Sequence, residues 1–268
     1  MDTADISPKD VMTLRQRTGL GMMDCKKALA DANGDMAAAE ELIRQRMKGK
    51  MDSRTDRPAG EGCIVVAMDG GKAAILEVRA ETDFTARNDG FRGMAADLAK
   101  MSLEQAAGDV AVTDAMTKRL DDVRLTTGEN ISFARGRRLD GGSFGQYIHH
   151  DGKLGVLLQV EGEVPADVLT GICQHVAAHV PTPMAVDEHG LDAAVVAQKR
   201  EEAQAEAAAS GKPAEIASKI AEGKVRKFFE ENTLLGQKFV RDESKQVRDL
   251  LPKGAKILAF VRMAVGGA

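Results

Sequence analysis

The apolar positions of residues 1–50 recur at spacings of three and four, a pattern that predicts helices rather than strands. Ser7 is a favourable N-cap and Pro8 suits the first helical position, so the first helix should begin there. Gly19 and Gly21 supply the flexible residues that end it. The segment therefore predicts a module of three short helices.

The second helix is predicted over 22–32, and the third after a turn at 33–35. The apolar positions expected to pack are Met22, Cys25 and Leu29 in the second helix and Met36, Leu42, Ile43 and Met47 in the third. Residues 51–60 are polar and contain Pro58 and Gly60, which indicates a linker.

After the linker the pattern becomes that of strands. Residues 62–81 predict a hairpin with its turn at 69–71, and a helix follows over 91–106. The same order recurs later in the chain, with a second hairpin over 147–162 and a second helix over 167–180.

The two hairpin units match without a gap. Sliding one onto the other places Asp69-Gly70 on Asp151-Gly152 and Leu76-Glu77-Val78 on Leu158-Gln159-Val160. A strand–turn–strand–helix unit used twice predicts two related α+β subdomains. Between the two units, 114–126 predicts another helix and 131–139 another strand.

The composition changes again in the last third of the chain. Residues 191–210 are rich in Ala and Glu and favour a helix, and a second helix is predicted over 214–231 after a break at Gly211. Two long, thinly apolar helices joined by a tight turn predict an antiparallel helical hairpin that projects as an arm. The tail should then form a loop at 234–240, a short helix at 244–251 and a final strand at 255–266.

These patterns together predict an α+β fold of five parts. The parts are a three-helix module (1–50), a linker (51–60), a core N-subdomain (61–140), a core C-subdomain (141–186 with 232–268) and a helical arm (187–231).

Charge and cysteine content restrict the classes of partner and compartment. A net charge of −4 argues against binding by bulk attraction to phosphate, so we expect no direct contact with nucleic acid. Cys25, Cys63 and Cys173 are too few and too scattered for a disulfide framework, which fits a reducing compartment. The N-terminus has no apolar leader and no run of about 18 apolar residues occurs, so we expect a cytoplasmic chain without a membrane span.

Catalytic and cofactor motifs are absent from the sequence, which contains no GxxxxGK[ST], GxGxxG or GxSxG pattern, so neither an enzyme nor a cofactor is predicted. His175 and His179 lie on one helix face near Cys173 and could ligate a metal, but without an HExxH glutamate we favour helix packing. His149 and His150 lie beside the second hairpin turn, where they are either surface residues or contacts to a partner.

Phe84 raises a different question, because this aromatic-poor chain places it in the polar stretch AETDFTARNDGF after a predicted strand. It either folds inward or is offered to a partner. The second repeat has Glu163-Val164-Pro165 at the corresponding place and no Phe. A packing role shared by both repeats therefore does not account for Phe84, and a contact to a partner is the favoured interpretation.

A basic run covers the end of the third predicted helix and the linker after it, with six basic residues against two acidic ones between Arg44 and Arg57. We interpret it as a solvated helix end whose cations suit the helix dipole. The alternative is a contact to an anionic surface.

The quoted motifs resemble those of the bacterial translation elongation factor Ts family. LRQRTGLGMMDCKKAL (14–29) and LEVRAETDFTARNDGF (76–91) are similar to the two long signatures of that family. Further similar segments follow in the same order over nearly the whole chain: GENISFAR (128–135), YIHHDGKLGVL (147–157), SGKPAEIASKIAEGKVRKFFEE (210–231) and LLGQKFVRDESKQVRDLL (234–251).

The resemblance implies a guanine-nucleotide exchange factor that binds elongation factor Tu in its GDP form, displaces Mg²⁺ and promotes GDP release during translation elongation. It implies that the N-terminal module is similar to ubiquitin-associated domains and docks on the GTP-binding (G) domain of the partner. The coiled-coil arm would reach a more distant domain, and a homodimer through this arm is a further expectation. Longer family members carry a C-terminal helical segment, which we expect this chain to lack after Ala268.

The resemblance also implies site residues. The Thr-Asp-Phe motif of the family, which acts as a wedge that dislocates Mg²⁺, matches Thr82, Asp83 and Phe84 here, with Thr85 where the family more often has an aliphatic residue. Phe84 would be the wedge, and Asp83 would shape or cap the loop at the following helix start.

Partner-binding residues are implied at two further places. Arg15, Met22 and Met23 would form the docking face of the module, and because Met22 and Met23 are adjacent they cannot both be fully inside. His150 matches best a family histidine that contacts the partner, with His149 as the alternative.

Two other classes of function compete with exchange. A non-catalytic adaptor would tether partners through the module and the arm and would not need Phe84. An enzyme would have to use His149, His150 and Cys173, whose spacing in the sequence supports no pocket.

Overall fold

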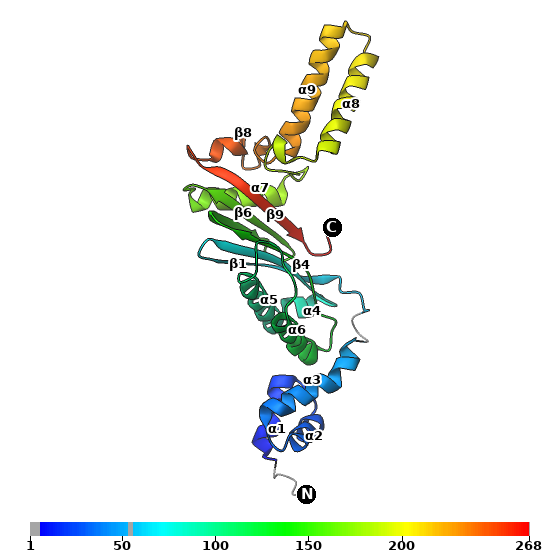
Figure 1. The fold of residues 1–268 in the computed structure, drawn as a ribbon, viewed down its shortest axis with the longest axis vertical. Helices are drawn as coiled ribbons and strands as arrows, with labels where there is room; N and C mark the ends of the chain where they lie inside the picture. The colour runs from blue at the N-terminus through cyan, green and yellow to red at the C-terminus, as the bar shows by residue number, and fades with distance from the viewer. Residues whose placement is uncertain (1–5, 53–55, 268) are drawn as a thin grey trace. The chain divides into compact units, whose positions relative to one another are not determined.

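The computed structural model describes residues 6–52 and 56–267, and the side chains of residues 47–52 lie outside that description. The chain forms two compact units. The first comprises residues 1–139, 148–154 and 263–268, and the second comprises 140–147 and 155–262. Figure 1 colours the chain from its N-terminus to its C-terminus and labels helices and strands where there is room.

Three helices form the module at the start of the first unit: α1 (Pro8–Thr18), α2 (Met22–Asp31) and α3 (Met36–Asp52). The predicted N-cap of α1 is confirmed, because the Ser7 hydroxyl accepts a hydrogen bond from the Lys9 N–H at 3.2 Å. α3 extends to Asp52 and so enters the stretch predicted as a linker.

The module has a small core of its own. Gly19 ends α1 in the left-handed region, with φ of 71°, as its predicted role requires. The buried residues are Val11, Leu14, Cys25, Ala28, Leu29, Ala39, Ile43 and, from a later helix, Leu125.

Met22 does not belong to this core, and its predicted packing position is wrong. It is the first residue of α2 and is 44% exposed, because the buried face of the helix consists of Cys25, Ala28 and Leu29. A small residue, Ala28, occupies a packing position that hydrophobic spacing alone does not distinguish. The predicted contact of the Met47 side chain lies outside the described part of the chain.

The first unit continues with a sheet of order β1-β2-β4-β3. β1 (Glu61–Asp69) and β2 (Lys72–Ala80) form the predicted antiparallel hairpin. β4 (Ser132–Asp140) confirms the strand predicted after the turn, and β3 (Gly108–Asp109) is a two-residue edge strand that the sequence pattern did not predict.

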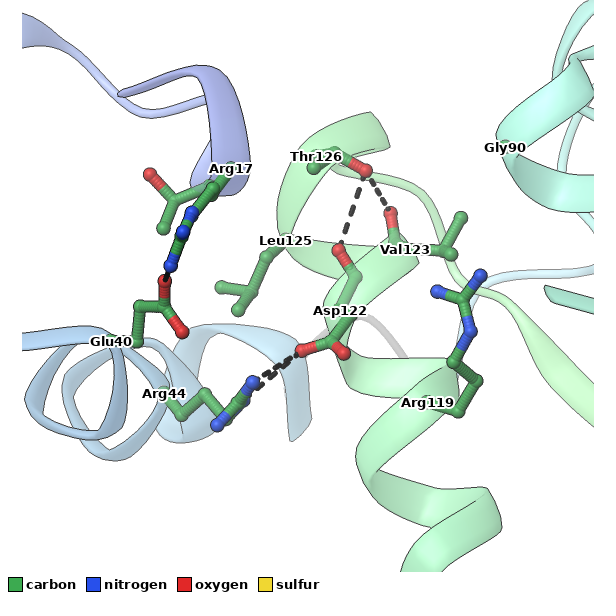
Figure 2. A pocket seen from close by; sticks show the side chains of 10 residues that line it. Arg17, Glu40, Arg44, Gly90, Arg119, Asp122, Val123, Leu125 and Thr126 are labelled. Atoms are coloured by element: carbon green, nitrogen blue, oxygen red, sulfur yellow. Dashed lines mark hydrogen bonds and ion pairs between the residues drawn. The ribbon is translucent and has the colours of Figure 1, made fainter. Parts of the chain in front are cut away.

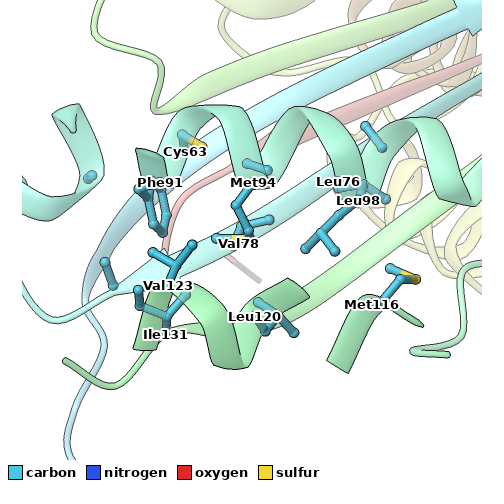
Figure 3. Packing of buried hydrophobic residues seen from close by; sticks show 14 of the residues in the cluster. Cys63, Leu76, Val78, Phe91, Met94, Leu98, Met116, Leu120, Val123 and Ile131 are labelled. Carbon is cyan, nitrogen blue, oxygen red and sulfur yellow. The ribbon is translucent and has the colours of Figure 1, made fainter. Parts of the chain in front are cut away.

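Helices α4 (Asp83–Arg87), α5 (Asp89–Ser102) and α6 (Asp114–Thr127) accompany this sheet. α5 and α6 pack against β2 through one hydrophobic cluster, which Figure 3 shows from close by. Its members include Leu76 and Val78 from β2, Phe91, Met94 and Leu98 from α5, Met116, Leu120 and Val123 from α6, and Ile131. This cluster is the rigid base on which the shorter α4 lies.

The repeated hairpins carry a buried polar residue at the matching position. Glu77 in β2 is fully buried, and its carboxylate accepts hydrogen bonds from Arg79 and Arg135, each at 2.8 Å, and from the Gly266 N–H at 2.9 Å. Gln159 is 8% exposed and donates to two backbone carbonyls near the start of its own hairpin, at 2.7 and 2.8 Å. In both repeats a polar group stays buried because its hydrogen bonds are satisfied.

The second unit is built on a three-stranded sheet of order β5-β6-β9. The strands are β5 (Ser143–Ile148), β6 (Leu154–Glu161) and β9 (Lys256–Ala264), and α7 (Ala166–Ala178) packs on them. The predicted second hairpin, its helix and the final strand are thereby confirmed. The core includes Val156, Leu158, Val160, Ile172, Cys173, Val176, Leu234, Val247 and Ile257.

The long helical hairpin follows a short 3-10 helix, η1 (Glu188–Gly190). Its helices, α8 (Ala193–Ala209) and α9 (Ala214–Asn232), lie side by side (Figure 1). Buried alanines, Ala203, Ala207 and Ala221, form the centre of their contact. Small side chains allow the two helices to approach closely while burying little apolar surface.

The tail differs from its prediction in two places, because a two-residue strand lies within the loop predicted over 234–240 and a second strand covers the start of the helix predicted over 244–251. A two-stranded sheet of β7 (Lys238–Phe239) and β8 (Asp242–Gln246) precedes a single 3-10 turn, η2 (Val247–Leu250). The helix predicted over 244–251 is therefore wrong for its first residues, because β8 pairs with β7 across the sheet. Within residues 6–52 and 56–267, no helix has the length and apolar content needed to cross a bilayer.

Candidate functional site

The one-turn helix α4 exposes an aromatic ring and buries its neighbours. Phe84 is 84% exposed, whereas Thr85 and Ala86 are buried at 7% and 5%. The segment expected as a loop is thus a helix whose inner face, through Ala86, joins the cluster of α5 and α6. Phe84 does not fold inward, and its exposed apolar surface is the kind that a protein partner can cover.

Thr82 fixes the point where α4 begins. Its side-chain oxygen accepts a hydrogen bond from the Thr85 N–H at 3.3 Å, which makes it the N-cap. The same hydroxyl donates to Oε1 of Glu129 at 2.7 Å, and the Thr82 backbone N–H donates to Oε2 at 3.2 Å. Both carboxylate oxygens of Glu129 are therefore bonded to Thr82.

A second carboxylate joins the same two segments in the opposite direction. Glu81 accepts a hydrogen bond from the Asn130 N–H at 2.6 Å, and the Asn130 side chain donates to the Arg57 carbonyl at 2.7 Å. Residues 81–82 and 129–130 thus hold each other by reciprocal bonds. This arrangement connects the end of β2 to the start of β4, directly before the helix that carries Phe84.

Asp83 does not cap the helix, because Thr82 occupies that position. It is the first residue of α4, where an acidic side chain suits the helix dipole. Its carboxylate pairs with Arg87 one turn later at 3.3 Å, on the solvent side of the helix. This exposed ion pair contributes little to stability, and Asp83 is left accessible.

The predicted docking residues of the module lie on its surface. Arg15 is exposed in α1, and Met22 and Met23 in α2 are 44% and 76% exposed. Met12, also in α1, is 55% exposed and was not singled out by the sequence reasoning. A module that leaves three methionines in water presents an adaptable apolar surface.

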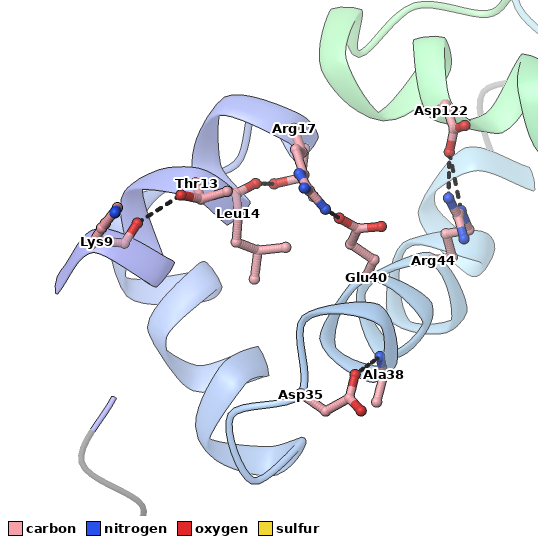
Figure 4. Close-up of polar contacts among 10 residues, drawn as sticks. Lys9, Thr13, Leu14, Arg17, Asp35, Ala38, Glu40, Arg44 and Asp122 are labelled. Carbon is pink, nitrogen blue, oxygen red and sulfur yellow. Dashed lines mark hydrogen bonds and ion pairs between the residues drawn. The ribbon is translucent and has the colours of Figure 1, made fainter. Parts of the chain in front are cut away.

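Contacts with α6 hold the module in place within the first unit. Arg44 of α3 donates from Nε and Nη2 to Oδ1 of Asp122, at 3.1 and 2.6 Å, and Arg17 bonds to Glu40 at 3.0 Å inside the module (Figure 4). Leu125 of α6 is buried among the apolar residues of the module. The junction between the module and α6 therefore combines the Arg44–Asp122 ion pair with the apolar contact of Leu125.

A hollow of about 420 Å³ lies beside these contacts (Figure 2). Three arginines line it, and each has a carboxylate partner: Arg17 with Glu40, Arg44 with Asp122, and Arg119 with Asp97. The hollow thus offers no surplus of positive charge, and we interpret it as part of the junction between the module and α6.

Ion pairs within the chain engage part of the basic run between Arg44 and Arg57. Arg44 pairs with Asp122 and Arg46 pairs with Asp31 at 2.5 Å, so these two cations serve contacts within the chain. The side chains of Lys48 and Lys50, and Arg54 as a whole, lie outside the described part of the chain.

His149 and His150 occupy the tight turn between β5 and β6. The His149 N–H donates to the Leu154 carbonyl at 2.8 Å, and the His149 carbonyl accepts from the Gly152 N–H at 2.8 Å. Their rings lie 4.3 Å apart between centroids, with His149 half-buried and His150 exposed. Of the two, His150 presents more of its surface to solvent.

The remaining histidine pair serves packing. His175 is fully buried, its Nε2 bonds to Oε1 of Gln237 at 2.9 Å, and its Nδ1 accepts the Val240 N–H at 3.2 Å. Burial, above all, lowers the pKa of His175 to about 4, with the nearby His179 acting in the same direction. Both ring nitrogens are thus used within the protein, which supports the packing interpretation over a metal site.

Cys173 is equally unsuited to catalysis. It is fully buried in the second core, and burial raises the pKa of its thiol to about 12. A protonated, enclosed thiol is a poor nucleophile and a poor metal ligand. Among residues 6–52 and 56–267, no group of three or more His, Cys, Asp or Glu side chains is arranged to hold a metal ion.

Sequence reasoning did not single out Glu129 and Asp122, which are distant in sequence from the residues they hold. Glu129 lies within the motif GENISFAR, and that motif was its only signal in the sequence. Asp122 has no signal of its own, because an acidic residue on an exposed helix face is ordinary.

Comparison with known proteins gives one consistent result. Residues 81–267 match the family model described as elongation factor TS. An elongation factor Ts of Zymomonas mobilis is 39% identical, with 98% of this chain and 93% of the relative covered. Those of Thioalkalivibrio sulfidiphilus and Methylococcus capsulatus are each 42% identical, covering 97% and 96% of this chain and 92% and 90% of the relatives. The chain belongs to the elongation factor Ts family.

Proposed function

We propose that this protein is the guanine-nucleotide exchange factor of elongation factor Tu and that Phe84 is the side chain that drives GDP release. The observation that carries the proposal is the 84% exposure of Phe84 on a capped helix whose other face is buried. Family membership supports elongation factor Tu as the partner, and the exposure of Phe84 on α4 supports its role as the side chain that acts on it.

The physical requirement for exchange is a difference in affinity. A GTPase holds GDP through backbone amides, a lysine and Mg²⁺ bridging to the phosphates. An exchange factor must bind the nucleotide-free partner more tightly than the loaded one, and by linkage GDP then weakens the factor in the same ratio. Covering a phenylalanine ring contributes roughly 1.5–3 kcal/mol, which offsets part of the distortion that displaces Mg²⁺.

Four residues would form the wedge. Phe84 enters the G domain of the partner, and Asp83, exposed beside it, offers a carboxylate to the same surface. Thr82 caps α4, and Thr85, on the buried face of the same helix, anchors it to the protein. The hydroxyl of Thr85 replaces the aliphatic group that the family more often has there without exposing the residue.

The remaining predicted contacts extend the interface. The UBA-like module would dock on the G domain through Arg15, Met22 and Met23, all of which are exposed. His150, exposed in the turn after β5, would contact the same partner, with the ring of the half-buried His149 tilted against it. The coiled-coil arm of α8 and α9 would reach a more distant domain, and a homodimer through this arm stays a separate prediction.

Stopped-flow release of a fluorescent GDP analogue from purified elongation factor Tu, with Mg²⁺ present, tests the proposal. An exchange factor accelerates release by orders of magnitude at substoichiometric amounts. A tether that only links partners through the module and the arm binds elongation factor Tu and leaves the release rate unchanged, which would refute the proposal.

A further inference from the structure

We infer that Glu129 is the positioning residue of the Phe84 wedge, acting through Thr82. The inference rests on the exchange function proposed above and adds to it a residue outside the Thr-Asp-Phe motif. It follows from the hydrogen bonds that hold α4 and from the exposure of the other side of this helix, where Phe84 and the Asp83–Arg87 pair lie in solvent.

The Thr82 hydroxyl links Glu129 to α4, because it bonds both to the Glu129 carboxylate and to a backbone N–H of the helix. A hydroxyl has a single hydrogen, and here that hydrogen goes to Oε1 of Glu129 at 2.7 Å. Because this hydrogen points to Glu129, a lone pair of the Thr82 oxygen accepts the hydrogen bond from the Thr85 N–H at 3.3 Å. The cap of α4 is therefore oriented by the carboxylate, and the second bond, from the Thr82 N–H to Oε2 at 3.2 Å, fixes the backbone at the same point.

α4 needs such a tie because it is too short to hold itself. A helix of five residues has no independent stability, so its position depends on tertiary contacts. On the outer side Phe84 is exposed and the Asp83–Arg87 pair lies in solvent. The tie to Glu129, the burial of Thr85 and Ala86, and a bond from Nε of Arg92 to the Ala86 carbonyl at 3.4 Å are among the contacts that hold α4 and so set the direction of the ring.

Glu129 itself is well supported. It follows Gly128, which ends α6 in the left-handed region with φ of 72°. Its own N–H donates to the Thr127 hydroxyl at 3.3 Å, and the next residue, Asn130, is tied back to Glu81 at 2.6 Å. The carboxylate thus extends from a fixed turn at the end of a packed helix.

Loss of Glu129 should impair GDP release after the partner has bound, and not the binding itself. A wedge whose base is loose still touches the partner but does not transmit the displacement that releases Mg²⁺. Loss of Glu129 should therefore lower the maximal rate of catalysed GDP release and leave the partner concentration at half-maximal rate nearly unchanged. Loss of a docking residue such as Met23 should do the reverse.

The test uses the full-length chain with Glu129→Gln, Glu129→Ala, Thr82→Val and Thr82→Ser, and with the double variant Glu129→Ala/Thr82→Val. Asp109→Asn is the matched control, because it removes a carboxylate bonded to an arginine (Arg137, at 2.8 Å) elsewhere on the same sheet. Each variant is measured for thermal unfolding, for kcat and KM of fluorescent GDP release from elongation factor Tu, and for hydrogen exchange of the Thr85 and Ala86 amides.

Glu129→Ala and Thr82→Val should each reduce kcat by roughly tenfold or more, as expected for bonds to a charged group, with KM within about twofold. The double variant should lose clearly less than the sum of the two single losses, since both single variants remove the bond between the Thr82 hydroxyl and Glu129. Thr82→Ser keeps the hydroxyl and should restore the rate, Glu129→Gln should be intermediate, and Asp109→Asn should match the wild type.

Additive effects in the double variant, failure of Thr82→Ser to restore the rate, or a fall in kcat that parallels a fall in melting temperature would overturn the inference. The hydrogen-exchange readout separates it from the proposed function. If the wild-type chain itself does not accelerate GDP release, the exchange function fails. Faster exchange at Thr85 and Ala86 in Glu129→Ala would still support the positioning of α4, and unchanged exchange there would refute it.

Discussion

Phe84 and Phe91 belong to one short stretch of sequence and have opposite environments. Phe91 is fully buried in the cluster formed by α5 and α6, and Phe84 is 84% exposed on α4. The chain changes direction between them because α4 and α5 are capped separately. Asn88 ends α4 and caps α5, accepting a hydrogen bond from the Gly90 N–H at 2.8 Å. One ring belongs to the core and the other lies in solvent.

The two phenylalanines should therefore differ in stability tests. Phe91→Ala should lower the free energy of unfolding by about 3–5 kcal/mol, because it leaves a cavity in the core. Phe84→Ala should change it by less than about 0.5 kcal/mol, because the ring is already in water. Equilibrium urea unfolding measures both. Equal losses in the two variants would show that Phe84 packs inside in solution.

The main elements could be predicted from the sequence because their signals are local. Ser7 and Pro8 gave the start of α1, and the turn at Asp69-Gly70 gave the first hairpin. A strand or helix with clear periodicity and a turn at each end depends little on distant residues. The repeat of the hairpin unit likewise appears in the sequence itself.

The site could be predicted only in part, since its supports come from far along the chain. The exposure of Phe84 was inferred from its polar surroundings and from the absence of a Phe at the corresponding place of the second repeat, but α4 is too short to show a helical period. Asp83 was expected to shape or cap the loop, whereas Thr82 is the cap and is itself bonded to Glu129. A contact between residues so distant in sequence leaves no periodic or compositional signal.

Acid should destabilise the second unit through His175. Its pKa is lowered to about 4 in the folded protein by burial, whereas an unfolded chain has about 6.5. Between these values the unfolded state binds the extra proton. The stabilising effect of the neutral ring is thus complete above about pH 6.5 and is lost as the pH falls to about 4, a difference of about 3 kcal/mol.

The hydrogen bonds of His175 also predict that its protonation destabilises the folded protein. The Nδ1 atom of His175 accepts the Val240 N–H, so an added proton there would face another donor. Urea unfolding between pH 4 and pH 7 measures the effect in the wild type and in His175→Asn. The variant should be less stable at pH 7 and should show a smaller loss between the two pH values. An identical pH dependence in both proteins would contradict the assignment.

Leu125 should matter more than the ion pair beside it for holding the module to α6. Leu125→Ala removes a buried side chain from the core of the module and should cost about 2–5 kcal/mol. Asp122→Asn weakens the ion pair with Arg44 and should cost about 1 kcal/mol or less. The side chains of this pair are partly exposed, Arg44 by 20% and Asp122 by 38%.

Hydrogen exchange of the amides in α1–α3, compared with those of α5, measures this difference. Leu125→Ala should speed exchange in the module selectively. Leu258→Ala, which truncates a side chain that is 47% exposed in β9, is the control and should leave the module unchanged. A larger effect from Asp122→Asn than from Leu125→Ala would show that charge, not apolar burial, fixes the module.

The rate of GDP release from elongation factor Tu, measured with the wild-type chain, with Phe84→Ala and with Met68→Ala, tests whether the Phe84 ring acts as the wedge. Met68 is an exposed apolar residue of β1, 42% exposed, and controls for loss of surface contact in general. The wedge account predicts that wild type and Met68→Ala accelerate release equally. Phe84→Ala should still bind the partner but lose most of the acceleration. Full acceleration by Phe84→Ala would contradict the account, because the ring would then not be the group that displaces Mg²⁺.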